Sequence, residues 1–190
     1  MAAFTVIDHQ ELGASEWAPS GSTTVSSWTK SSIPSTYDHL LILCSTRMAG
    51  STYMGEGNLA FNGVMTASEY SLTRLGSYEA SGSSTVWSAR NTSSANGITA
   101  DLAIGVDQTA DYYTSTKIWV PNYAGTVGNK QVLIQTPAPS NVNTDYYWTL
   151  RLHAGLWAPS TPAAIHTCTL TGSSDYAQYT TITLYGVKGA

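Results

Sequence analysis

The sequence predicts an all-β protein, a jelly-roll-like sandwich of two antiparallel sheets with about eight or nine strands. Charged residues make up only 11% of the chain, against about 25% in average proteins, so the solvent-facing Lys, Glu and Arg of ordinary helices are scarce. Hydroxyl side chains are abundant, with 24 Ser and 26 Thr, and Thr, Tyr and Trp favour strands. Short alternating segments recur between turn signals, and 190 residues suit one jelly-roll domain over residues 1–190 better than an immunoglobulin-like domain of about 100 residues.

In the first half of the chain, one segment stands out as a central strand. Tyr37–Ser45 follows the turn at Ile33-Pro34 and has apolar residues on both faces, so we expect the core to cover one face and a neighbouring subunit the other. In contrast, Ala80–Gly97 is dominated by small polar residues and predicts a long mobile excursion with one candidate strand at 85–89. The remaining segments with strand character are 4–7, 24–29, 58–62 and 69–75.

The second half alternates more regularly. Residues 98–106, 114–120, 130–136, 146–156, 165–170 and 180–188 have strand character. Trp119 falls on the polar face of its strand, opposite Ile118 and Val120, and we expect another subunit or the Pro121–Gly125 loop to bury it. In the C-terminal segment, Ile182 and Leu184 should face the core, with the strand beside Tyr37–Ser45.

The segment 146–156 predicts a strand with a leucine-rich inner face. We expect Trp148, Leu150, Leu152 and Ala154 to face inward, and Thr149, Arg151 and His153 to face outward.

Charge and hydropathy exclude several classes of partner. The net charge is −4, the sequence pI is near 5.4, and the eight Lys and Arg residues are scattered, so no basic face for nucleic acid is expected. No apolar run approaches the ~18 residues of a membrane-spanning helix, and Met1–Thr5 lacks the pattern of a signal peptide. We therefore expect neither membrane nor nucleic-acid partners, and no secretion by the usual route.

No residue constellation indicates catalysis. The histidines (His9, His39, His153 and His166) are far apart in sequence, and no Gly-x-Ser-x-Gly, P-loop or EF-hand spacing occurs. Cys44 and Cys168 lie in separate apolar segments without a Cys-x-x-Cys spacing, so we expect two buried free thiols rather than a disulfide or a zinc site. The prediction is a non-enzyme with no catalytic residues, no metal and no cofactor.

Aromatic residues are the most promising binding groups. The chain has 12 Tyr and 6 Trp against 2 Phe, and Tyr and Trp combine a large apolar area with a polar group. Filling of the core or of a subunit interface is the simpler explanation, and a carbohydrate site is the alternative. The candidates for an interface or ligand site are Trp119, Tyr123, Tyr112, Tyr113, Tyr146, Tyr147 and Trp148.

Three groups of segments, spanning most of residues 31–188, carry a family resemblance. They are Ser31–Ile42 with Arg47; Phe61-Asn62-Gly63 with Tyr70, Leu75, Trp119–Gly125 and Lys130; and Gly155-Leu156-Trp157 with Ala163–Ile165, Leu170 and Thr183–Lys188. Together they resemble small virion structural proteins of marine and cyanobacterial bacteriophages. Val64 departs from the pattern, which has Asp after Phe-Asn-Gly, so the acidic contact that the pattern implies is not expected here.

The resemblance implies a β-sandwich on the capsid exterior or the tail, with no active site to carry over. The expected function is a head decoration (cement) protein on the outer capsid surface, with a homotrimer favoured and the major capsid protein or tail proteins as partners. The alternative is a tail-fibre or tail-tip module that binds host-surface carbohydrate. A polysaccharide depolymerase ranks third.

Overall fold

The computed structural model describes residues 3–12, 24–50, 54–80, 83–104, 112–138 and 149–189. Within these ranges, the regular structure is twelve strands and one short 3-10 helix, η1 (Ala67–Glu69). The strands are β1 (Ala3–Glu11), β2 (Thr24–Lys30), β3 (His39–Thr46), β4 (Met54–Phe61), β5 (Tyr70–Ala80), β6 (Ser83–Asn91), β7 (Ile98–Ile104), β8 (Thr114–Pro121), β9 (Lys130–Ala138), β10 (Thr149–Trp157), β11 (Cys168–Ala177) and β12 (Thr181–Lys188). The all-β prediction is confirmed. In the part of the chain described here, no helix has the length and apolar character needed to cross a membrane.

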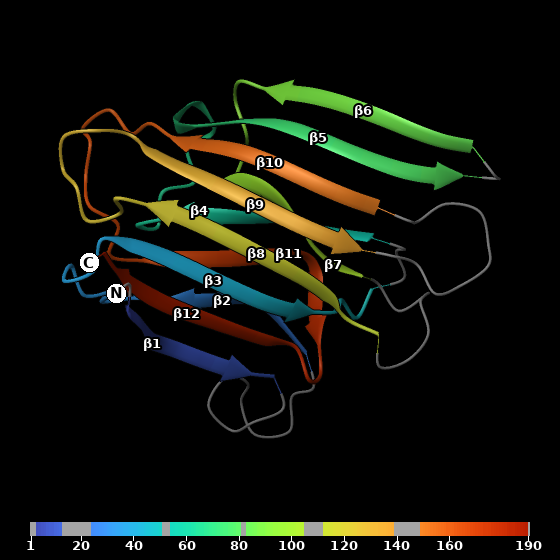
Figure 1. Ribbon diagram of the computed structural model, residues 1–190, viewed down its shortest axis with the longest axis horizontal. Helices are drawn as coiled ribbons and strands as arrows, with labels where there is room; N and C mark the ends of the chain where they lie inside the picture. Colours follow the sequence, from blue (N-terminus) through green and yellow to red (C-terminus); the bar gives the residue numbers. More distant parts are fainter. Residues whose placement is uncertain are drawn as a thin grey trace.

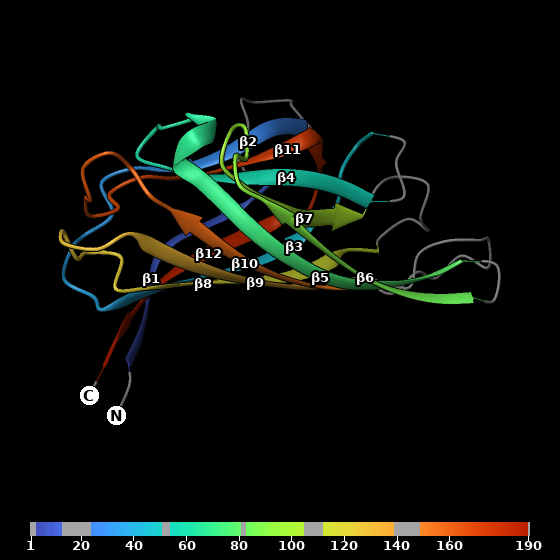
Figure 2. The same ribbon diagram turned by 90° about the horizontal axis from the view of Figure 1, so that it is seen from above.

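The two sheets follow the strand order of a jelly roll. The smaller sheet runs β2-β11-β4-β7, and the larger sheet begins β1-β12-β3-β8. When β5, β6, β9 and β10 are set aside and the other eight strands are numbered along the chain, these orders become 2-7-4-5 and 1-8-3-6, the arrangement of an eight-stranded jelly roll. Figure 2 shows the two sheets as separate layers.

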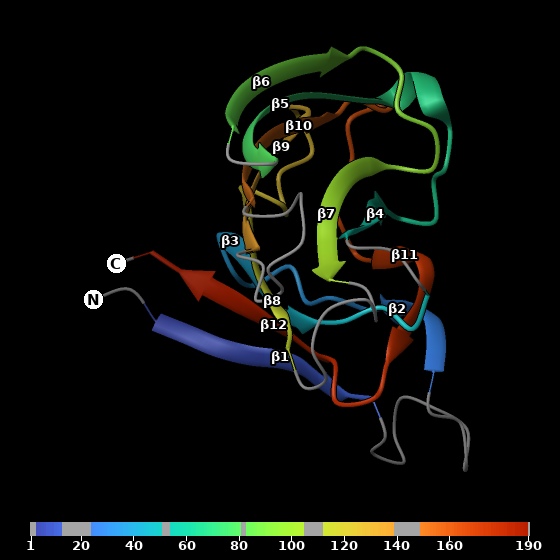
Figure 3. The same ribbon diagram turned by 90° about the vertical axis from the view of Figure 1, so that its right-hand side faces the viewer.

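Two inserted strand pairs widen the larger sheet. They continue it beyond β8 in the order β9-β10-β5-β6, so that eight strands lie side by side (Figure 1). Figure 3 shows that the sheet curves at its β5–β6 end. The predicted count of eight or nine strands is therefore too low. The candidate strand at 85–89 is confirmed, and it extends over Ser83–Asn91, an edge strand paired with β5 along its whole length, so much of the expected excursion is regular structure.

The core lies between the two sheets. Alternate side chains of the larger sheet, such as Ile42 and Ile118, are fully buried against Trp28, Leu59 and Leu170 from the smaller sheet. Each such aliphatic side chain contributes about 1.5–3 kcal/mol by leaving water.

The C-terminal strand lies where the sequence predicts it. β12 pairs antiparallel with both β1 and β3, and Ile182 and Leu184 are fully buried.

Cys44 and Cys168 are buried free thiols, as expected. Burial raises the pKa of Cys44 to about 12 and also raises the pKa of Cys168, so both thiols stay protonated and unreactive at neutral pH.

The turn after β4 has a structural role. Asn62 and Gly63 both adopt left-handed backbone, with φ of 53° and 72°. The Asn62 side chain accepts hydrogen bonds from the backbone N–H groups of His166 and Thr167 at 2.9 and 3.1 Å, and donates one to the carbonyl of Ala164 at 2.8 Å. Val64, where the family pattern has Asp, packs partly buried against the core, so this position makes an apolar contact.

Two further contacts connect segments that carry the family resemblance but lie far apart in the sequence. The Tyr123 hydroxyl donates to the carbonyl of Pro34. The Tyr37 ring lies directly on Gly186, where an added Cβ would be 2.3 Å from ring atoms. These contacts give the turn residues in the resemblance segments a structural role within the chain.

Candidate functional site: the outer face of the larger sheet

The face of the larger sheet turned away from the smaller one, called the outer face below, carries a large set of exposed apolar side chains. The strand registers place them on this face, opposite the core positions Ile42, Ile118 and Ile134. The set is Phe4, Val6, Leu43, Leu75, Val86, Leu133, Leu150 and Leu152. Where such side chains adjoin, as Leu75 and Leu152 do in direct register, an exposed apolar patch marks a candidate interaction surface.

Strand β10 supplies part of this surface because it is turned opposite to the prediction. Leu150 and Leu152 are 61% and 38% exposed and Ala154 is exposed, whereas His153 is only 1% exposed. The predicted inward leucines and outward Arg151 and His153 were wrong. Trp148, predicted to face inward, lies outside the described residues.

The end of β10 explains its orientation. Trp157 is 1% exposed, with its ring 5.6 Å from that of Phe61 and 6.5 Å from that of Tyr70, and its indole N–H donates to Glu69 at 3.3 Å. Gly155 lies so close to Ile98 that an added Cβ would be 2.7 Å from it. Side chains alternate along a strand, so fixing 155 and 157 inward places Arg151 and His153 inward and the leucines outward.

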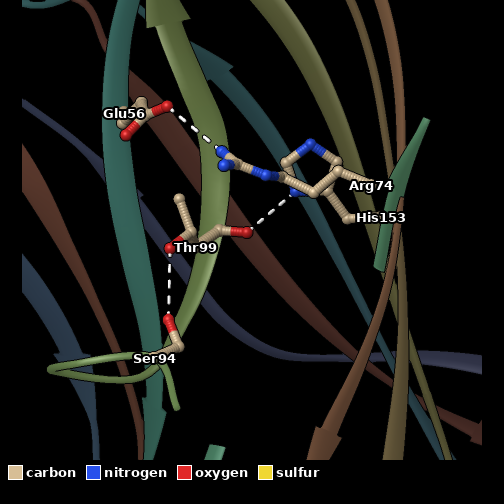
Figure 4. Close-up of polar contacts among 5 residues, drawn as sticks. All are labelled: Glu56, Arg74, Ser94, Thr99 and His153. Atoms are coloured by element: carbon tan, nitrogen blue, oxygen red, sulfur yellow. Dashed lines mark hydrogen bonds and ion pairs between the residues drawn. The ribbon is translucent and has the colours of Figure 1, made fainter. Parts of the chain in front are cut away.

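The inward polar groups of β10 and β5 form hydrogen bonds between the sheets (Figure 4). His153 Nδ1 lies 2.8 Å from the carbonyl of Thr99. Since a carbonyl only accepts, this nitrogen carries the proton and donates. The Thr99 hydroxyl is 3.2 Å from that of Ser94, and Arg74 forms an ion pair with Glu56 at 3.3 Å.

The same inner region holds two arginines around one indole. The guanidinium carbons of Arg74 and Arg151 lie 5.6 and 5.3 Å from the centre of the Trp87 ring, on the edge strand β6. Cation–π contacts of this kind contribute about 0.5–1 kcal/mol or more as they become desolvated. This polar cluster connects β4, β5, β6, β7 and β10, so its role is to hold the inserted strands to the jelly roll.

A groove crosses the outer face beside Trp119. A row of directly paired residues runs across five strands: Trp119, Leu133, Ala154, Thr73 and Arg90. The small side chains of Ala154 and Thr73 lie between large ones, which leaves a hollow of about 580 Å³. The row from β8 to β6 spans four strand spacings, about 19 Å.

The groove is lined by groups of mixed character. Gln131, Ser71 and Arg90 supply polar groups, and Leu133 and Leu156 supply apolar ones. A second hollow of about 340 Å³ lies on the other side of Trp119 and is lined by Lys117, Trp119, Leu133 and Gln135.

Trp119 is half-buried, with its ring centre 4.9 Å from that of His39 at an angle of 48°. As predicted, it faces away from the buried Ile118 and Val120. Burial of Trp119 by another subunit stays a prediction.

Of the other aromatic candidates, the three that the structure describes do not join Trp119. Tyr112 and Tyr113 are half-buried next to the opposite end of β8, and the Tyr113 hydroxyl donates to the carbonyl of Gln178 at 2.8 Å. Tyr123 is fully buried, so its selection as an interface or ligand residue was wrong and its ring belongs to the core. Tyr146, Tyr147 and Trp148 lie outside the described residues.

The described residues contain no group of three or more His, Cys, Asp or Glu side chains placed to hold a metal ion.

Searches against protein-family models, curated proteins and solved structures found no match to this chain.

Proposed function

We propose that this protein is a structural component of a bacteriophage virion, a head decoration protein that attaches to the outer capsid surface. The observation that carries the proposal is a cluster of exposed apolar side chains on β10, β5 and β6, called here the leucine patch: Leu75, Val86, Leu150 and Leu152. Their exposed fractions are 50%, 74%, 61% and 38%.

The leucine patch has the character of a protein-docking surface. A hollow of about 250 Å³ lies among these four side chains, with Gly76 and Ser77 completing its lining. An apolar side chain from a partner fits such a hollow, and well-packed apolar anchors dominate the energy of protein interfaces. The resemblance to phage virion proteins favours a capsid protein as that partner.

We further propose that the protein attaches as a homotrimer. Several copies of a modest contact, joined in one oligomer, bind a repeating capsid lattice far more tightly than one contact does. Light scattering on the purified protein tests this part independently, and a monomer at micromolar concentration would contradict it.

Reattachment to virions tests the function. Particles that lack the protein are mixed with purified protein, and bound copies are located by cryo-electron microscopy. We expect density on the capsid exterior with the native chain, and at least a tenfold loss of binding with Leu150→Asp or Val86→Asp. Val127→Asp is the matched control, because Val127 is 92% exposed in the loop between β8 and β9.

Density at the tail alone would contradict the decoration proposal and favour the tail-fibre alternative. Equal binding of Leu150→Asp, Val86→Asp and the native chain would show that another surface makes the attachment.

A further inference from the structure

The groove beside Trp119 combines features that the leucine patch lacks. Its lining includes the half-buried indole of Trp119, the amide of Gln131, the hydroxyls of Ser71 and Thr73, and the guanidinium of Arg90. An aromatic ring offers a flat apolar surface with a polar edge. Binding sites of about 300–1,000 Å³ with a few convergent polar groups are typical of small-ligand and oligomer recognition.

Among the described residues, the charged side chains that line the groove and the neighbouring second hollow all have one sign. The charged residues among those lining the two hollows are Arg90 and Lys117, both cations, although the whole chain carries a net charge of −4. Arg90 ends the row of paired residues that starts at Trp119, and Lys117 lies two residues before Trp119 on β8. An anionic ligand is therefore favoured here over a neutral or cationic one.

The shape favours a chain-like ligand. Between Trp119 and Arg90 the floor of the groove includes Leu133, Ala154 and Thr73, so an extended molecule can lie across the strands over about 19 Å. We infer that this groove binds an acidic polysaccharide chain, with a sugar ring against Trp119 and a sugar carboxylate at Arg90. Gln131 and the hydroxyls of Ser71 and Thr73 are placed to hydrogen-bond the sugar hydroxyls.

Nucleic acid, another polyanion whose rings can pack against an indole, fits less well. Binding to its phosphate backbone draws on many cations at once, and two cations line these hollows. The inference does not rest on the proposed function, because the groove and the leucine patch are lined by different residues.

Chemical-shift mapping of the indole N–H of Trp119 tests the inference. The resonance is assigned by its loss in Trp119→Phe, and the native protein is titrated with oligogalacturonate, with cellohexaose and with a single-stranded oligonucleotide. We expect a saturable shift with oligogalacturonate that is at least tenfold weaker in Arg90→Gln and is weakened several-fold by 0.5 M NaCl. Leu43→Ala is the control, since Leu43 is exposed on the same face outside the groove, and it should bind normally.

Four results would overturn the inference. They are no shift with oligogalacturonate, an equal shift with cellohexaose, a shift with the oligonucleotide alone, and a shift that follows protein concentration instead of ligand. The last would show that a second copy of the chain occupies the groove. Arg90 is exposed, so Arg90→Gln is expected to fold and gives a result that is independent of substitutions at Trp119.

Discussion

Strands β3 and β10 lie in the same sheet but divide their side chains in opposite ways. In β3 the inward positions Leu40, Ile42 and Cys44 are buried and apolar. In β10 the inward position His153 is polar and the outward Leu150 is 61% exposed. The difference shows that the orientation of a strand depends on its best-packed residues. In β10 these are Gly155 and Trp157, which outweigh two leucines.

The two strands also have different neighbours. β3 belongs to the jelly roll and lies between β12 and β8, whereas β10 belongs to the inserted pairs and lies between β9 and β5. The inserted strands combine a partly polar interior with an apolar exterior, and this combination leaves exposed apolar side chains on the outer face.

Removing a strand from the jelly roll should have the largest effect. Deletion of residues 180–190 removes β12, which pairs with both β1 and β3, and with it the buried Ile182 and Leu184. The two buried side chains contribute about 1.5–3 kcal/mol each, and the pairing of two neighbouring strands is lost as well. The total loss is a large part of a typical free energy of unfolding of about 5–15 kcal/mol. We expect no soluble folded protein, and a soluble product with an unchanged melting temperature would refute this.

Trp157→Ala should have the next largest effect. The ring packs against Phe61 and Tyr70 in the core, so its removal should lower the free energy of unfolding by about 3–5 kcal/mol. Urea denaturation measures the loss. Trp119→Ala is the control: because Trp119 is half-buried on the outer face, it should cost much less and leave the sandwich folded. Equal losses would show that Trp119 is also a core residue.

Two alanine variants on β10 separate its faces. His153→Ala leaves the Thr99 carbonyl without this donor between the sheets and should lower the free energy of unfolding by about 1–3 kcal/mol. Leu150→Ala should change it by about 0.5 kcal/mol or less, as is usual at exposed positions. Thermal denaturation in matched buffers compares the variants, and a larger loss for Leu150→Ala would reverse the assignment of the faces.

Alkaline pH should act on groups buried in the core of the sandwich. Burial raises the pKa of Cys44 and Tyr70 to about 12 and also raises the pKa of Cys168 and Tyr176. The unfolded chain loses these protons first, so stability is complete below the ordinary thiol pKa of 9.0 and falls as pH rises toward about 12. At pH 9.5 the loss is about 1 kcal/mol for each thiol. A melting temperature that is constant from pH 8 to 10.5 would contradict this.

The sequence predicts the jelly roll well because its strands alternate clearly. Ile118 and Val120, or Ile182 and Leu184, mark the inner face without ambiguity, and the pairing of β12 beside β3 follows from their apolar character. The order of the inserted strands could not be predicted, because Ser83–Asn91 is exposed at a sheet edge and has little hydrophobic pattern.

The candidate site was predictable only in part. Trp119 was selected correctly as an outward aromatic residue, whereas Tyr123 could not be distinguished from a surface residue by its type. The groove residues Thr73, Arg90 and Gln131 come from three strands and become neighbours only through strand register. One feature of the sequence does indicate the orientation of β10. Trp157 lies four residues after His153, so both side chains point to the same face of the strand, and Trp157 is the larger side chain to bury.

Thiol accessibility in β10 tests the central claim most directly, that its leucines face out and its polar residues face in. Leu150→Cys and His153→Cys are treated with a maleimide under native conditions, and mass spectrometry follows the labelling. The native chain serves as the blank, since Cys44 and Cys168 are buried. We predict rapid labelling of the cysteine at position 150 and slow labelling at position 153. Rapid labelling at 153 with protection at 150 would contradict the account.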